Sequence, residues 1–108
     1  MITIALVDDH TVVVEGLKLL LDSFDDVTVV GTAHDGQAGA QLVVSLRPDV
    51  VLMDLSMPVL DGVQATRLVT EGAPDTAVVV LTTSTDRDLV LRSLDAGAVG
   101  YLMKDTDP

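Results

Sequence analysis

Four short apolar segments of this 108-residue sequence are each followed by side chains that could carry chemistry. The segments are residues 2–7, 50–53, 77–81 and 98–103, and they are followed by Asp8 with Asp9, by Asp54, by Thr82 and by Lys104, respectively. Apolar runs of this length that contain β-branched residues predict buried strands. If the strands are parallel, their carboxyl ends meet at one edge of the sheet, where such sheets bind ligands. We therefore expect three carboxylates, a hydroxyl and an ammonium to lie together.

These side chains predict a particular chemistry. Neighbouring carboxylates repel one another unless a cation lies between them. Because carboxylate oxygens that leave room for water and phosphate suit Mg²⁺, the three acids predict a magnesium site. Thr82 and Lys104 add donors for anionic oxygens. A carboxylate nucleophile, a metal ion and fixed donors are what the formation of an aspartyl phosphate requires, so this is the reaction that the set favours.

The elements that must position these residues follow from the periodicity between the apolar segments. They are a helix over 12–23, a strand over 27–31, a helix over 36–46, a helix that begins at Asp61 and a helix that begins at Asp86. The resulting (βα)4β order predicts an α/β fold, a doubly wound five-stranded parallel sheet with right-handed crossovers. In the helix over 36–46, we expect Ala38, Leu42 and Leu46 to form the buried face.

The order of elements raises a hypothesis about the carboxyl-terminal end. A doubly wound sheet of five strands ordinarily has a fifth helix, but only residues 105–108 follow Lys104. We expect that this last helix is missing and that the chain belongs to a longer parent protein. Apolar surface should then be exposed beside the helix over 12–23, or a partner should cover it.

The composition excludes several classes of protein. The formal net charge of −11 makes this segment a poor candidate for binding nucleic acid itself. Because the chain contains no cysteine, it has neither disulfides nor thiolate metal sites. No apolar run reaches the ~18 residues of a membrane span. The amino terminus does not resemble a signal peptide, so a cytoplasmic location is expected.

The sequence resembles the receiver domain of two-component response regulators over essentially its whole length, residues 1–108. The matching segments are Val-Asp-Asp-His at 7–10, Met-Asp-Leu-Ser-Met-Pro at 53–58, Asp-Gly at 61–62, Leu-Thr-Thr at 81–83 and Gly-Tyr-Leu-Met-Lys-Asp at 100–105. The resemblance is strongest to the NarL/FixJ (LuxR-type) subgroup. It implies a flavodoxin-like sheet with the strand order 2-1-3-4-5.

The resemblance also implies a role for each matching residue. Asp54 would be the phosphoacceptor. Mg²⁺ would be held by Asp9, Asp54 and the backbone carbonyl of Ser56, with Asp8 acting largely through water. The residues that would respond to the phosphoryl group are Lys104, which contacts it, Thr82, the hydroxyl switch, and Tyr101, the aromatic switch.

The partners implied are a sensor histidine kinase, a second copy of the chain in a possible homodimer, and DNA through an output domain that this chain lacks. The parent would be a transcription regulator, and the domain a phosphoacceptor that hydrolyses its phosphate slowly, not an enzyme.

Other interpretations of the same residues remain open at this point. Asp8 and Asp9 alone could be a turn and capping pair. His10 and His34 are each expected to be surface or capping residues. A degenerate receiver that acts only as a docking module is one alternative. An aspartyl-nucleophile phosphohydrolase is less favoured, because Ser56 stands where such enzymes carry a second aspartate. A nucleotide-binding domain is unsupported, because no glycine-rich phosphate-binding loop follows any of the predicted strands.

Overall fold

Strands and helices alternate along the chain as the sequence predicts. The computed structural model describes residues 1–57, 60–82 and 87–103. The strands are β1 (Ile2–Val7), β2 (Val27–Ala33), β3 (Val50–Asp54), β4 (Ala77–Thr82) and β5 (Gly100–Met103). The helices are α1 (Thr11–Asp22), α2 (Gly36–Leu46), α3 (Gly62–Gly72) and α4 (Arg87–Asp95).

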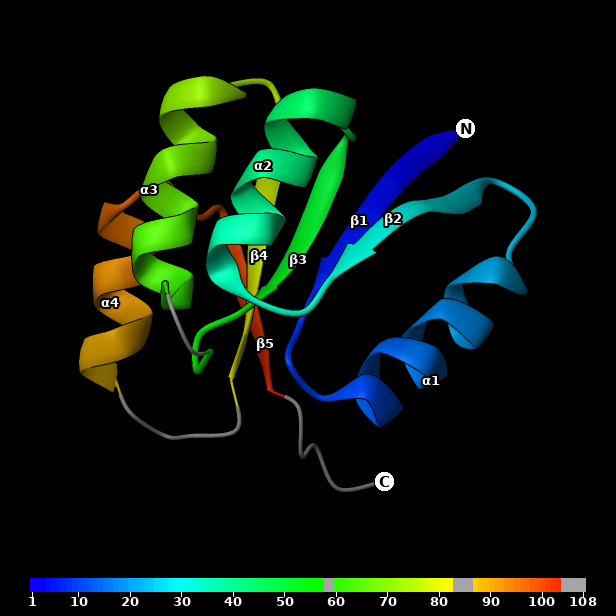
Figure 1. Ribbon diagram of the computed structural model, residues 1–108, viewed down its shortest axis with the longest axis horizontal. Coiled ribbons are helices and arrows are strands. Elements are labelled where there is room, and N and C mark those ends of the chain that lie inside the picture. The colour runs from blue at the N-terminus through cyan, green and yellow to red at the C-terminus, as the bar shows by residue number, and fades with distance from the viewer. Residues whose placement is uncertain (58–59, 83–86, 104–108) are drawn as a thin grey trace.

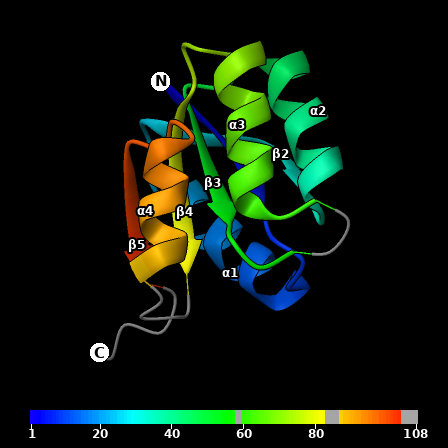
Figure 2. The ribbon, with the colours of Figure 1, turned by 90° about the vertical axis from the view of Figure 1, so that its left-hand side faces the viewer.

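The five strands form one parallel sheet in the order β2-β1-β3-β4-β5 (Figure 1). This order and the doubly wound architecture are those that the sequence and its resemblance predict. Among the helices of the described residues, α2, α3 and α4 lie on one face of the sheet and α1 lies on the other (Figures 1 and 2). The strand β3 is central, and four of its five residues are buried.

The core is divided by the sheet into two parts. The larger part lies beneath α2, α3 and α4 and includes Val7, Val51, Met53 and Val80. The smaller part lies beneath α1; its buried members are Ile4, Leu6, Val14, Leu52 and Leu81. Alternate residues of β1 and β3 therefore face opposite parts of the core, as the period of two of a strand requires.

The helix α2 corrects one sequence prediction. Its buried residues are Gly36, Gly39, Ala40 and Val43, whereas Ala38 and Leu46 are exposed and Leu42 is only partly buried. A Cβ atom at Gly39 would meet Cγ1 of Val7 and would lie 2.8 Å from its Cγ2. At Gly39 the helix approaches β1 so closely that no larger residue fits. A search for bulky residues at helical spacing therefore selects the wrong face.

The amino-terminal end of the sheet is fastened by Thr3 and Asp49. The backbone N–H and the hydroxyl of Thr3 donate to Oδ2 of Asp49 at 2.8 and 3.1 Å, respectively. The N–H of Asp49 donates in return to the Thr3 hydroxyl at 2.9 Å. These hydrogen bonds, above all that from the Thr3 backbone, lower the pKa of the Asp49 carboxyl because they stabilise its charged form. The pair fixes the start of β3 relative to β1.

Apolar side chains are exposed on the side of the sheet that carries α1, as the sequence predicts. Leu19 and Leu20 of α1 are exposed, and so is Leu102 of β5. Leu102 pairs with Leu81, a member of the core beneath α1, so it points to the same face. Within the part of the chain that the structure describes, no helix is long and apolar enough to span a membrane.

Candidate functional site

The register of the sheet places the ends of β1 and β3 side by side. Leu6 pairs with Leu52 and Val7 with Met53, so Asp8 follows β1 at the level where Asp54 ends β3. Both aspartates continue the alternation of the residues that face α1, and both are almost fully buried, at 1% and 2% exposure. The pairing of these two core strands therefore places the two carboxylates close to each other.

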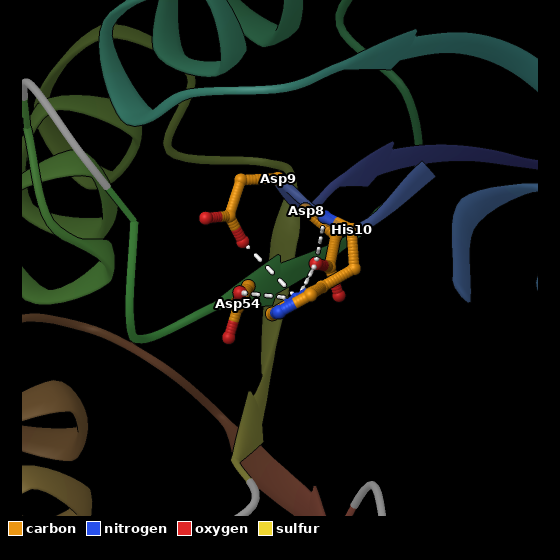
Figure 3. Close-up of side chains that lie close together, drawn as sticks. All are labelled: Asp8, Asp9, His10 and Asp54. Carbon is orange, nitrogen blue, oxygen red and sulfur yellow. Dashed lines mark hydrogen bonds and ion pairs between the residues drawn. The ribbon is translucent and has the colours of Figure 1, made fainter. Parts of the chain in front are cut away.

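Four side chains converge at this point (Figure 3). Asp8, Asp9, His10 and Asp54 each offer one ligand atom, and these atoms all lie within 4.8 Å of one another. Asp9 and His10 are exposed, while Asp8 and Asp54 form the buried floor. We call these four residues the acidic cluster. Three of them are the carboxylates that the sequence predicts to lie together.

His10 is the member that sequence reasoning missed. It stands at the N-cap position of α1, but its side chain makes no capping hydrogen bond. Its Nδ1 instead lies 3.0 Å from Oδ1 of Asp8, 3.1 Å from Oδ1 of Asp9 and 4.0 Å from Oδ2 of Asp54 (Figure 3). The only sequence signal was its position directly after the two aspartates. The other histidine, His34, lies outside the cluster, with its Nδ1 3.3 Å from the backbone oxygen of Asp8.

The turn from β1 into α1 explains how the cluster is held. The backbone N–H of Asp8 donates to the carbonyl of Ala33, which continues the pairing of β1 with β2. The N–H of His10 donates to Oδ1 of Asp8 at 2.9 Å. The Asp8 carboxylate therefore orders the turn that carries Asp9 and His10.

The segment after β3 is fixed by the start of α3. Asp61 caps this helix in a capping box with Gln64, which confirms the predicted N-cap. The N–H of Gly62 donates to the carbonyl of Leu55, and a Cβ atom at Gly62 would lie 2.5 Å from Cα of Leu55. The helix terminus thus lies directly against the end of β3. Glycine permits this approach, because a side chain at position 62 would meet the backbone of Asp54 and Leu55.

The remaining predicted site residues are distributed around the cluster. Ser56 is exposed, and its N–H donates to Oδ1 of Asp54 at 3.3 Å. Thr82 is buried at the end of β4, next to β3 in the sheet. Tyr101, in β5, is 51% exposed. Lys104 lies outside the described residues, as does Asp86, the predicted cap of α4.

The donor set of the cluster fits a divalent cation. The three carboxylates offer hard oxygen ligands, which Mg²⁺ prefers. The two exposed members leave one side of the cluster open for water and for an incoming anion. Chemically, the arrangement presents two buried carboxylates, Asp8 and Asp54, to a place where a cation would offset negative charge.

Comparisons with known proteins agree with this geometry. Residues 4–108 match the family described as the response regulator receiver domain. The chain is 44% identical over 105 residues to the uncharacterized transcriptional regulatory protein YhcZ of Bacillus subtilis (strain 168), covering 97% of this chain and 49% of that protein. It is 40% identical over 106 residues to the nitrate/nitrite response regulator protein NarL of Escherichia coli (strain K12), covering 98% and 49%, respectively.

A solved structure is similar over nearly the whole chain. The signal receiver domain of the putative response regulator NarL from Mycobacterium tuberculosis matches with a TM-score of 0.92 at 34% identity, covering 98% of this chain and 86% of that chain. The chain spans about half the length of the curated relatives it matches.

Proposed function

Because the chain belongs to the response regulator receiver domain family, with relatives of the NarL and LuxR type, we propose that it is a phosphoacceptor domain whose acceptor is Asp54. The observation that carries this proposal is the position of Asp54. It ends the central strand, is buried, and lies in a cluster with two other carboxylates. A carboxylate in this position faces both a cation site and the open side from which a phosphodonor approaches.

In the proposed metal site, Mg²⁺ would be held by Asp9, Asp54 and the backbone carbonyl of Ser56, and Asp8 would act largely through water. When bound, the ion offsets the negative charge that gathers on the transferring phosphoryl group. The burial of Asp8 and Asp54 supports the assignment, because two carboxylates removed from water together require a compensating positive charge.

The transfer step is a displacement at phosphorus. An oxygen of Asp54 attacks the phosphoryl group of a phosphohistidine on a sensor kinase, the P–O bond forms, the P–N bond breaks, and the imidazole of the kinase leaves. Attack by water on the acyl phosphate later returns the carboxylate and inorganic phosphate. Ser56, two residues after the acceptor, stands where aspartyl-nucleophile phosphohydrolases carry a second aspartate, so we propose a signalling phosphoacceptor with at most slow self-dephosphorylation.

The proposed output is a change at the surface around β4 and β5. Phosphorylation replaces a charge of −1 with one of about −1.5 to −2 and adds acceptor oxygens. The hydroxyl of Thr82 moves toward the new oxygens, Lys104 contacts them, and Tyr101 moves inward. The buried position of Thr82 and the exposed position of Tyr101 are the starting state that such a switch needs.

The proposal extends to the protein in which this domain works. Of the relatives named above, YhcZ is described as a transcriptional regulatory protein and NarL as a response regulator protein, and both are about twice as long as this chain. We propose that the phosphorylated surface controls a DNA-binding output domain in a cytoplasmic transcription regulator and supports a homodimer. The net charge of −11 fits a domain that does not itself bind DNA.

Intact-mass spectrometry after incubation with acetyl phosphate tests the proposal. We expect a Mg²⁺-dependent gain of one phosphoryl group that Asp54→Asn abolishes and Asp49→Asn, at the opposite end of β3, leaves unchanged. A folded wild-type protein that gains no phosphoryl group under any condition would overturn the proposal and favour a docking module.

A further inference from the structure

The imidazole of His10 occupies an unusual place for a helix-capping residue. Its Nδ1 is directed into the acidic cluster (Figure 3), within 3.1 Å of carboxylate oxygens of both Asp8 and Asp9. No side-chain bond ties the ring to α1, and the side chain is 59% exposed. Its position is therefore set by the cluster and not by the helix that it begins.

The spacing of Nδ1 relative to the proposed metal ligands matches that of a shared coordination sphere. With bonds of about 2.1 Å, adjacent ligand atoms of an octahedral ion lie about 3.0 Å apart and opposite ones about 4.2 Å apart. Nδ1 lies 3.1 Å from Oδ1 of Asp9 and 4.0 Å from Oδ2 of Asp54. Both distances fall in the range that two ligands of one such ion span.

We infer that His10 is a nitrogen ligand of this metal site and that it shifts the preference of the site toward transition-metal ions. The inference rests on the proposed function, because it requires a divalent cation at Asp9 and Asp54. Imidazole nitrogen suits ions such as Ni²⁺ and Zn²⁺, whereas Mg²⁺ is bound by oxygen. Without an ion, Nδ1 lies 3.0 Å from Oδ1 of Asp8, a hydrogen bond in which Nδ1–H donates to the carboxylate. On coordination, this proton passes through water to Nε2, and Nδ1 gives its lone pair to the ion.

Loss of the His10 imidazole should therefore change the affinity of the site for transition-metal ions more than its affinity for Mg²⁺. A site of carboxylates and one carbonyl holds Mg²⁺ without His10, so loss of the imidazole leaves Mg²⁺ affinity within about twofold. A transition ion loses a direct ligand. Since outer-shell partners of metal sites already contribute about 10–100-fold to affinity, removal of a ligand should weaken Ni²⁺ binding by at least about tenfold.

The test combines spectroscopy with calorimetry on the intact chain. Electron spin-echo measurements with Mn²⁺ report whether an imidazole nitrogen is bound to the ion, and titration calorimetry gives the affinities for Ni²⁺ and Mg²⁺. The chain has two histidines, so His34→Ala is the matched control for His10→Ala. We expect imidazole coupling in the wild type and in His34→Ala but not in His10→Ala, and a Ni²⁺ affinity that falls only in His10→Ala.

The outcomes separate this inference from the proposed function. One outcome is that Mn²⁺ and Mg²⁺ bind to the wild type, the Mn²⁺ spectrum shows no imidazole coupling, and His10→Ala leaves the Ni²⁺ affinity unchanged. In that case His10 is not a ligand, while the proposed Mg²⁺ site stands. If Asp9→Asn also leaves the affinity for every ion unchanged, the metal site itself is wrong. His10→Gln, which keeps a polar side chain of similar reach, should retain the fold and lose the coupling.

Discussion

Asp8 and Asp54 are placed at the same level of the sheet by the pairing of Val7 with Met53, and both are buried within one cluster. The relationship links the core to the site, because the register of two apolar strands decides where two carboxylates meet. A shift of one residue in either strand would turn its aspartate toward the opposite face.

Magnesium should stabilise the folded chain. Because the proposed site forms only in the folded state, Mg²⁺ at a hundredfold excess over its dissociation constant should raise the free energy of unfolding by about 2.7 kcal/mol. Urea denaturation with and without Mg²⁺ measures this increment. It should vanish in Asp9→Asn, whose side chain is exposed, and persist in Asp25→Asn, an exposed acid in the turn after α1. An equal increment in both variants would place the ion elsewhere.

The close approach of α2 to β1 should make Gly39 sensitive to a single methyl group. A Cβ atom there would meet the side chain of Val7, so Gly39→Ala should lower the free energy of unfolding by about 1–3 kcal/mol. Gly16→Ala is the matched control, since Gly16 lies in α1 with nothing within 4 Å of the added atom. That variant should gain about 0.5–1 kcal/mol from helix propensity. Similar values for both variants in urea denaturation would contradict the packing described.

The prediction for Asp49 concerns pH. Its folded-state pKa is lowered by the hydrogen bonds from Thr3, so its contribution to stability is present above the unfolded pKa of about 3.9 and is lost as the pH falls through the folded pKa. Thr3→Val removes the hydroxyl, the second of these causes, and should move the pKa of Asp49 part of the way up toward its ordinary range, because the backbone hydrogen bond remains. NMR titration of the side-chain carbonyl carbon measures this.

Thr28→Val serves as the control for that experiment, because Thr28 pairs with Thr3 on the neighbouring strand β2. It should leave the pKa of Asp49 unchanged. If both substitutions move that pKa equally, the shift does not come from the Thr3 hydroxyl.

The sequence predicts the strands well, because apolar, β-branched runs such as that of β3 have few alternatives in a buried sheet. The convergence of Asp8, Asp9 and Asp54 follows from the same pattern, since parallel strands share one carboxyl edge. The order of the strands does not follow from periodicity, and it came from the resemblance to receiver domains. Local composition cannot distinguish one permutation of buried strands from another.

Two features depend on tertiary distances that a pattern does not contain. The buried residues of α2 include Gly36 and Gly39, because the helix lies at close range to the backbone of Leu60 and to the side chain of Val7, respectively. The imidazole of His10 lies in the cluster because the backbone at that residue is extended, with φ −95° and ψ 102°, before α1 begins. Hydrophobic periodicity does not reveal that a glycine packs against a neighbouring element, and it does not predict the conformation of this turn.

The identity of the phosphorylated residue tests the central claim most directly. After incubation with acetyl phosphate and Mg²⁺, borohydride reduction converts an aspartyl phosphate to homoserine, and peptide mass spectrometry then locates the converted residue. We predict homoserine at position 54 only. Homoserine at position 8 or 9, with Asp54 intact, would contradict the account.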